Sequence, residues 1–301
     1  MNTPNFDETA LIDEDSTKSS KEVKGYPARE VVGALQWVAT CARPDIAVPT
    51  AALARHVASV PTVAFAKACR KVLQYLLTTA SIGVSYIPEE EEKFNEIYAT
   101  LLPEGRDLPR LNIFSDAGFA NNVKCFHSTS GSIGYWRSVP IYWKSQRQGV
   151  RAYSTAESEY IAASDTIVVS EHNDFMSFFE RLPSTMVEPS YGISPTLEDA
   201  VLWVDNESAI ATANATDTKP RGRHYALRYL RVREASQSIV FCPTHLMKAD
   251  GLSKVSLTEP QRGLLLHHVS NPTIDDEGVS LVEEGNHSYL LVCEFSVVFG
   301  F

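Results

Sequence analysis

The first third of the chain carries apolar residues at helical spacing. From Glu30 onward, Val31, Leu35 and Val38 fall on one face of a helix, because they recur every three or four positions. Pro44 interrupts this pattern, since proline is disfavoured in a helix interior. The spacing predicts a small helical region of three helices, at about residues 30–41, 46–59 and 62–79.

From residue 111 onward, short apolar or alternating runs indicate β-strands. Five strands are predicted, at 111–116, 130–136, 140–144, 200–205 and 238–242. Helices are predicted between and after them, at about 156–180, 206–213 and 222–235, with a loop at 183–198. This order of elements implies an α/β fold, in which a mixed five-stranded sheet is flanked by helices.

Composition divides the chain into five parts. Residues 1–25 are polar and acidic, so we expect disorder there. Residues 26–87 contain the helical region, and residues 88–107, with prolines and four consecutive glutamates, are expected to form an irregular linker. The α/β domain is expected at 108–255, and the pattern assigns no role to the extension at 256–301.

The bulk composition is that of an ordinary globular protein, with 44% hydrophobic and 21% charged residues. No apolar run approaches the roughly 20 residues that cross a bilayer, and the polar, acidic start has no signal-peptide pattern. We therefore expect an intracellular protein of the cytoplasm or nucleus, neither secreted nor partnered by a membrane. The five cysteines are widely spaced, so we expect reduced, mostly buried thiols and neither a disulfide framework nor a zinc site.

The net charge of −10 argues against a nucleic-acid partner only if it is spread evenly. Residues 1–25 carry −3 and residues 255–301 carry −6, so the stretch between them carries only −1. Within that stretch, one segment holds seven basic side chains and no acid: Lys219, Arg221, Arg223, His224, Arg228, Arg231 and Arg233. Because a phosphate backbone meets local charge, this segment is a candidate phosphate contact, with a solvated basic helix surface as the alternative.

Four acidic residues follow predicted strands or begin predicted helices: Asp116, Glu159, Asp205 and Asp250. Acids at such places can meet at one edge of a sheet, where open α/β sheets bind ligands. Carboxylates gathered there repel one another unless cations neutralise them, and oxygen ligands suit Mg²⁺ or Mn²⁺. Two such ions would position the attacking water and the leaving oxygen of a phosphodiester. Each acid alone also has a structural explanation, as a helix cap or a turn former.

Eight short motifs follow one another between Tyr26 and Lys254: Ala42-Arg43-Pro44-Asp45-Ile46; Lys71-Val72-Leu73-Gln74-Tyr75-Leu76 followed by Thr79; Ser115-Asp116-Ala117; Ser128-Thr129-Ser130-Gly131; Trp143-Lys144-Ser145-Gln146-Arg147-Gln148; Ser154-Thr155-Ala156-Glu157-Ser158-Glu159-Tyr160; Asp205-Asn206-Glu207-Ser208-Ala209-Ile210; and Ala249-Asp250-Gly251-Leu252-Ser253-Lys254. In this order they resemble the C-terminal part of the Pol polyprotein of Ty1/copia-type retrotransposons. Gly118-Phe119, where the family usually has Asp-Trp, and Gly251, where it usually has Ile, depart from the pattern.

The resemblance implies that residues 26–87 are the tail of a reverse transcriptase and residues 108–255 a ribonuclease H (RNase H) domain. The polymerase motif Tyr-x-Asp-Asp is absent from the sequence, so we expect no DNA synthesis, and a polymerase domain would be a partner supplied in trans. The family's metal ligands map onto Asp116, Glu159, Asp205 and Asp250. Glu157 is the alternative to Glu159, because residues two apart on a helix point about 200° apart; the context Glu-Tyr-x-Ala favours Glu159.

The reaction that the resemblance implies is cleavage of the RNA strand of an RNA–DNA hybrid with two Mg²⁺ or Mn²⁺ ions. Asp116 and Asp205 would share the ions, Glu159 would lie toward the leaving group, and Asp250 would complete the second ion's shell. His245 would shuttle a proton, unless its role is structural. The hybrid backbone would meet a set of basic residues: Lys144, Arg147, Arg221, Arg223, Arg228 and Arg231. A virus-like particle is a further location that the family implies.

Two other functions fit the same residues. An integrase- or transposase-like nuclease of the same fold also uses acids and two metals, but its glutamate typically comes last, whereas here Glu159 comes second. The other is a truncated, catalytically inactive Pol remnant that at most binds nucleic acid, since the polymerase core is missing and both ends depart from the family.

Overall fold

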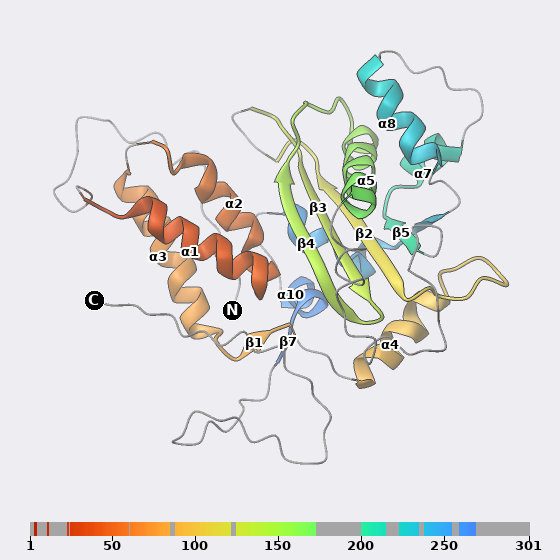
Figure 1. The fold of residues 1–301 in the computed structure, drawn as a ribbon, viewed down its shortest axis with the longest axis horizontal. Coiled ribbons are helices and arrows are strands. Elements are labelled where there is room, and N and C mark those ends of the chain that lie inside the picture. Colours follow the sequence, from red (N-terminus) through yellow and green to blue (C-terminus); the bar gives the residue numbers. More distant parts are fainter. Residues whose placement is uncertain are drawn as a thin grey trace.

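The computed structural model describes residues 3–4, 11, 23, 25–59, 61–84, 88–121, 125–172, 200–214, 223–234, 238–254 and 259–268. In it, a group of three helices lies beside a sheet that carries further helices (Figure 1). None of the described helices is both long enough and apolar enough to span a bilayer.

The helical group forms as the apolar spacing predicts. Its elements are three α-helices and a 3₁₀ turn: α1 (Ala28–Cys41), η2 (Pro44–Ile46), α2 (Ala47–His56) and α3 (Val63–Thr78). Thr62 caps α3, since its hydroxyl accepts the Phe65 N–H at 3.0 Å. The facing apolar residues form a core that includes Leu35, Leu53 and Val72.

A buried ionic network joins the turn before α2 to the end of α3. Arg43 and Asp45 are 6% and 1% exposed, and their side chains pair at 2.8 Å. Arg43 also donates to the backbone and hydroxyl oxygens of Thr79 at 2.9 and 2.7 Å, and the Tyr75 hydroxyl donates to Asp45 at 2.6 Å. Because a buried charge needs partners, this network gives a structural reason for the first two sequence motifs.

Removing one member of this network will leave a buried charge without its counter-charge. We expect Arg43→Met to lower the free energy of unfolding by about 3–5 kcal/mol, and Arg43→Met/Asp45→Leu to recover at least half of that loss. Lys93→Met is the matched control, because the Lys93–Glu90 pair is at the surface and worth less than about 1 kcal/mol. Urea unfolding followed by circular dichroism measures all three, and equal losses for Arg43→Met and Lys93→Met would contradict the prediction.

A mixed five-stranded sheet forms the second part of the chain, in the spatial order β4-β3-β2-β5-β6. The pairs β2–β3 and β3–β4 are antiparallel, and the pairs β2–β5 and β5–β6 are parallel. The five predicted strands are confirmed: β2 (Leu111–Gly118), β3 (Thr129–Trp136), β4 (Val139–Arg147), β5 (Ala200–Val204) and β6 (Ile239–Phe241). The predicted α/β class, with a mixed five-stranded sheet flanked by helices, is therefore confirmed.

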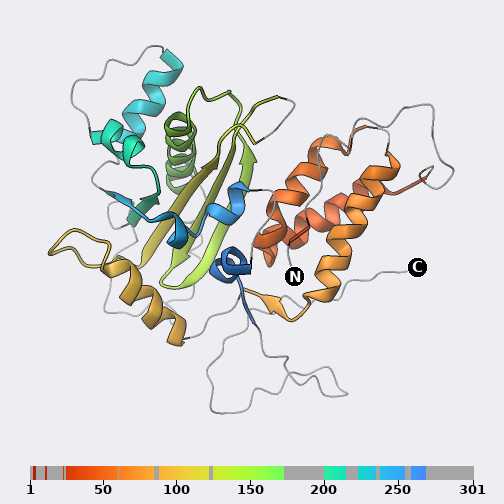
Figure 2. The ribbon, with the colours of Figure 1, turned by 180° about the vertical axis from the view of Figure 1, so that it is seen from behind.

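One face of this sheet carries a layer of helices, as Figures 1 and 2 show from opposite sides. They are the predicted ones: α5 (Thr155–His172), α7 (Glu207–Asn214) and α8 (Arg223–Glu234). Their core joins Ile113 and Leu202 of the strands to Tyr160, Ala213 and Val232 of the helices. The predicted remainder of the α5 helix and the predicted loop at 183–198 lie outside the described residues.

The other face is covered by a helix that the sequence pattern did not predict. The segment 88–107 is not the irregular linker expected from its prolines and glutamates, because α4 (Pro88–Ala99) occupies most of it. Proline is favoured in the first turn of a helix, and acids there interact well with the helix dipole. Phe94 and Tyr98, four residues apart, are buried together against Phe114 of the sheet. Thus α4 is part of the α/β body.

Both ends of the chain include residues that pack against the fold. Leu11 and Val23 are buried, which does not fit disorder at these two positions of the acidic start. Beyond residue 255, α10 (Glu259–Leu265) is followed by β7 (His267–His268), which pairs antiparallel with β1 (Ile82–Gly83). The start of the C-terminal extension is therefore tied to the end of the helical group, and residues 269–301 lie outside the described residues.

The helical group contacts the edge of the sheet. The indole nitrogen of Trp143 on β4 donates to the carbonyl oxygen of Ala39 on α1 at 2.6 Å. Ala47 of α2 and Ile82 of β1 pack against the core on the α4 face. Trp143, whose motif lies near the predicted substrate contacts, therefore joins the two parts of the chain.

The cysteines fit only part of the expectation made from their spacing. Cys69 and Cys242 are buried, but Cys41 is exposed and Cys125 is half-buried. These four form no disulfide with one another, and Cys293 lies outside the described residues. Two of the four described thiols are therefore buried, as expected, and two are not.

Candidate metal centre

Two of the acidic residues are brought together by the parallel pairing of β2 and β5. Ser115 lies opposite Val204 in the register, so Asp116 and Asp205, one residue further along each strand, meet where β5 ends. Asp116 does not end its own strand as predicted, because β2 continues to Gly118 against β3. The end of the short strand β5 therefore sets the edge at which the two carboxylates lie.

Glu159 reaches the same edge from the start of α5. Its Oε1 accepts the Ala117 N–H at 3.2 Å, which ties the side chain to β2. Glu157 instead closes a variant of the capping box: its Oε2 accepts the N–H of Tyr153, the residue before the N-cap, at 2.8 Å, while the hydroxyl of the N-cap Ser154 accepts the Glu157 N–H at 3.1 Å. The structure therefore brings Glu159, and not Glu157, to the other acids.

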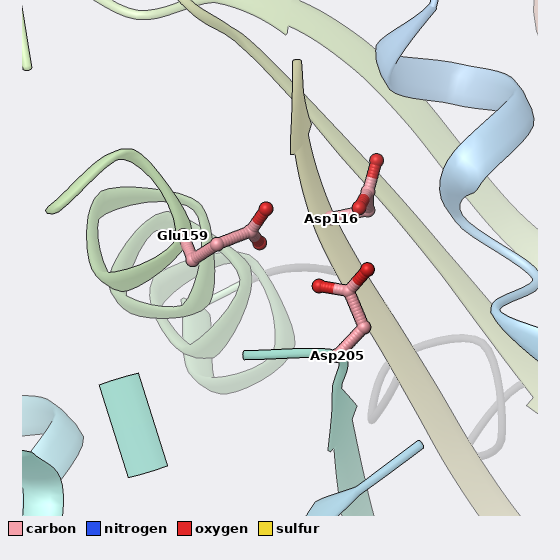
Figure 3. Close-up of side chains that lie close together, drawn as sticks. All are labelled: Asp116, Glu159 and Asp205. Atoms are coloured by element: carbon pink, nitrogen blue, oxygen red, sulfur yellow. The ribbon is translucent and has the colours of Figure 1, made fainter. Parts of the chain in front are cut away.

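Asp116, Glu159 and Asp205 form one group, in which each offers a carboxylate oxygen within 4.8 Å of the others (Figure 3). Asp116 and Glu159 are only 3% and 6% exposed. Burial, with the charge of Asp205, raises the pKa of Asp116 to about 7, and burial, with the charge of Asp116, raises the pKa of Glu159 to about 10. Such a group is costly to fold without a counter-ion.

The donor atoms of this group fit a divalent ion. Glu159 Oε2 is buried and has no hydrogen-bond partner in the part of the chain that the structure describes. Buried polar atoms without partners are rare, and a bound cation would supply the missing one. Carboxylate oxygens are also the ligands that Mg²⁺ and Mn²⁺ prefer. The three residues could therefore hold such an ion between them.

Asp250, the fourth predicted ligand, is engaged by other parts of the protein. It begins α9 (Asp250–Ser253) and is 3% exposed. The amine of Lys254 contacts one of its oxygens, and the side-chain amide of Gln261 contacts the other. After the larger effect of burial, the charge of Asp250 also raises the pKa of Asp205. Asp250 therefore belongs to the same electrostatic site, although it is not part of the three-residue ligand group.

A glycine lets α9 come this close to the sheet. A side-chain carbon on Gly131 of β3 would lie 2.8 Å from the carbonyl oxygen of Ala249. Ser253 of α9 donates its hydroxyl to Asp116, which lies opposite Gly131 in the β2–β3 register. The missing side chain at residue 131 thus positions both Asp250 and the hydroxyl that holds Asp116.

Gly131→Ala will push α9 away from the sheet, because the added carbon meets backbone atoms that cannot rotate aside. We expect the free energy of unfolding to fall by about 1–3 kcal/mol, and the rise in melting temperature on adding Mg²⁺ to shrink. Gly149→Ala is the control, because nothing lies within 4 Å of its added carbon. Thermal unfolding with and without Mg²⁺ tests both variants; a Gly131→Ala protein that behaves like the control would show that this close approach is not needed.

Comparison with known proteins finds relatives of this chain among transposon proteins. The retrovirus-related Pol polyprotein from transposon RE1 of Arabidopsis thaliana is 28% identical over 230 residues, which are 75% of this chain but 14% of that polyprotein. The putative transposon Ty5-1 protein of Saccharomyces cerevisiae is 30% identical over 143 residues, 47% of this chain and 41% of that one. This chain is a homologue of the Pol polyproteins of Ty1/copia-type transposons.

Two other matches differ from these in kind. The secreted RxLR effector protein 161 of Plasmopara viticola is 29% identical over 143 residues, 48% of this Pol homologue and 88% of that protein. An N-terminal RNase H domain from Mycobacterium tuberculosis, solved as a fusion with maltose-binding protein, aligns with 52% of this chain and 96% of that one at TM-score 0.31 and 11% identity. No family profile matches the chain.

A buried glutamine of this Pol homologue connects three of the sequence motifs. Gln148 is 1% exposed, and its amide nitrogen donates to the Ser130 hydroxyl at 3.0 Å and to the Ser158 carbonyl oxygen at 2.8 Å. Since Ser158 precedes Glu159, this bridge holds the start of α5 to β3. The sequence alone did not indicate this role of Gln148, or the contact of Lys254 with Asp250. The available signal was that both polar residues lie within the sequence motifs.

The predicted nucleic-acid contacts have different surroundings. Lys144 and Arg147 are exposed on β4, an outer strand of the sheet. Arg228 of α8 pairs with Asp165 of α5 at 3.5 Å, so part of its charge is balanced within the protein. Arg231 is half-buried on the same helix. The two residues of β4 are therefore the more accessible to a phosphate backbone.

Of the remaining predicted residues, Arg221 and the side chain of Arg223 lie outside the described part of the chain. His245 is exposed in the turn η5 (Thr244–Leu246). Its neighbour Thr244 donates to Asp205 Oδ2 at 3.3 Å, so the turn that carries His245 borders the acidic group.

Glu159→Gln will stabilise the metal-free protein. Without metal, folding must either bring a third negative charge to Asp116 and Asp205 or take up a proton at Glu159, and glutamine removes both costs. We expect the free energy of unfolding in EDTA at pH 8 to rise by about 1–2 kcal/mol, and the stabilisation by Mg²⁺ to disappear. Chemical unfolding in EDTA and in Mg²⁺ measures both effects; a destabilised variant that still responds to Mg²⁺ would contradict the assignment of this group.

Proposed function

We propose that this chain is a metal-dependent ribonuclease H that hydrolyses the RNA strand of an RNA–DNA hybrid. The observation that carries the proposal is the grouping of Asp116, Glu159 and Asp205, with ligand oxygens within 4.8 Å of one another at one edge of a mixed sheet. Homology to Pol polyproteins supports a role of the nuclease type. The order of the acids, with Glu159 second and on the first helix after three strands, favours a ribonuclease H over an integrase-like nuclease.

In this reaction the role of the protein is to hold the metal ligands and the substrate in place. A divalent ion bound here would polarise the scissile phosphodiester and activate a water molecule. Asp116 and Asp205 offer oxygens from adjacent strands, and Glu159 offers one from α5. The Ala117 N–H anchors one oxygen of Glu159, and the Ser253 hydroxyl anchors one oxygen of Asp116. Ligands that are held in this way need little rearrangement during the reaction.

The hybrid is proposed to contact the exposed residues of β4. Lys144 and Arg147 would meet phosphates, and these contacts would position the substrate without reading its sequence. Arg231 is a weaker candidate because it is half-buried, and Arg228 because it already pairs with Asp165. Discrimination between RNA and DNA would depend on the 2′-hydroxyl of the cut strand.

Cleavage of an end-labelled RNA–DNA hybrid by the purified full chain tests the proposal. We expect RNA-strand cleavage in Mg²⁺ or Mn²⁺ and none in EDTA. Glu159→Gln should lower the rate by about 100-fold or more, because a ligand should matter at least as much as the groups that support ligands. Glu157→Gln is the matched control: glutamine also serves in a capping box, so its rate should stay close to that of the unaltered chain.

Parallel assays with duplex DNA and single-stranded RNA separate the other functions. Cleavage of duplex DNA in place of the hybrid would favour the integrase-like nuclease. A folded chain that binds Mg²⁺ or the hybrid but cleaves nothing would favour the inactive Pol remnant, and either result would contradict the proposal.

A further inference from the structure

Asp250 differs from the other three acids in how its oxygens are used. Lys254, four residues later, contacts Oδ1 with its amine, and Gln261 contacts Oδ2 with its side-chain amide. Asp250 is almost fully buried, whereas the side chain of Lys254 is 45% exposed. Glu159, by contrast, has a buried oxygen without a hydrogen-bond partner among the described residues. Donors of the protein therefore occupy the fourth carboxylate, while the three-residue group keeps an oxygen available.

The charge of Lys254 acts on the whole acidic site. Burial is the main effect on the pKa of Asp116, Glu159 and Asp205, and it raises all three. The positive charge of Lys254 lowers each of these pKa values, so its amine lies within electrostatic range of every acid in the site. The Lys254 amine therefore supplies a positive counter-charge within the acidic site.

Gln261 is held in place by the packing of its own helix. It lies on α10, whose Leu265 is 1% exposed in the core on the α4 face of the sheet. The carbonyl oxygen of Leu264 accepts the Tyr135 hydroxyl at 3.1 Å and the Lys248 amine at 3.2 Å. The amide that contacts Asp250 is thus carried by an anchored part of the C-terminal extension.

We propose that Lys254 and Gln261 keep Asp250 from binding metal in the resting protein, so that a first ion binds to Asp116, Glu159 and Asp205 and a second ion binds only by displacing Lys254. This inference rests on the proposed function, because it concerns the same acidic site. Lys254 is then a positioning residue that makes the two ions unequal in affinity. Because the side chain of Lys254 is 45% exposed, its amine can move into solvent when a divalent ion, which interacts more strongly with the carboxylate, takes its place.

Calorimetric titration of the full chain with Mn²⁺ measures both steps. The unaltered chain should bind one ion tightly and a second ion at least about tenfold more weakly. In Lys254→Met and in Lys254→Met/Gln261→Leu, the second ion should bind about tenfold more tightly, because no amine competes for Asp250 or repels the incoming ion. The first ion should change less than the second, because Lys254 contacts Asp250 directly and the other three acids only through the longer-range effect of its charge. Lys93→Met removes the same charge from the exposed pair on α4 and should change neither step.

The outcomes separate this inference from the function on which it rests. If the unaltered chain binds no Mn²⁺, the metal centre itself is refuted, and this inference with it. If the first ion binds as expected but the second binds equally well in the unaltered chain and in both variants, only the role of Lys254 and Gln261 is refuted. Two ions of equal affinity in the unaltered chain would refute that role as well.

A measurement on the unaltered chain covers the case in which a variant fails to fold. Acetylation of lysines, followed by mass spectrometry, reports how accessible the Lys254 amine is. Its rate should rise several-fold between Mn²⁺ concentrations that fill the first site and those that fill the second, while the rate at Lys93 stays constant. A Lys254 rate that does not respond to Mn²⁺ would overturn the proposed displacement.

Discussion

Repulsion among three clustered carboxylates, two of which are buried, is the constraint on which the rest of the structure depends. Moving Asp116 and Glu159 out of water, and bringing the carboxylate oxygens of all three residues to within 4.8 Å of one another, opposes folding. Each must therefore be held by a rigid part of the fold. The parallel register fixes the two aspartates, and the capping box together with Gln148 fixes the helix that carries Glu159. The free energy lost at this edge is offset by the apolar cores on both faces of the sheet.

The parts of the fold that could be predicted are those where a physical pattern is local. A strand buried on both faces is a continuous apolar run, as at residues 200–204, and an acid directly after it is expected at the sheet edge. The geometry of a helix allows only one of Glu157 and Glu159 to face the site. The sequence also held the signal that assigns Glu157 elsewhere, since Ser154 three residues before a glutamate is the mark of a capping box.

The parts that could not be predicted depend on contacts between distant segments. The helix α4 is held by Phe94 and Tyr98 against aromatic residues of the sheet, while its run of glutamates is typical of a solvated linker. Gln148 is a polar residue whose partners become known only when β3 and α5 are placed. A glycine such as Gly131 weakens a strand when the strand is considered by itself. Its role, which is to make room for α9, becomes clear only when α9 is placed over it.

Asp250 shows why position in the topology is not enough to identify a metal ligand. Its place after β6, the last strand of the five-stranded sheet, makes it as good a candidate as the other three acids. However, Lys254 contacts one of its oxygens and Gln261 the other. A site that gathers four carboxyl groups is stabilised by a counter-charge even when no metal is bound, and an amine four residues away is the simplest source. A single positive charge interacts less strongly with carboxylates than a divalent ion does. In the proposed mechanism Lys254 therefore stabilises the metal-free site and competes with the second ion, so stability and readiness for the proposed reaction oppose each other at this residue.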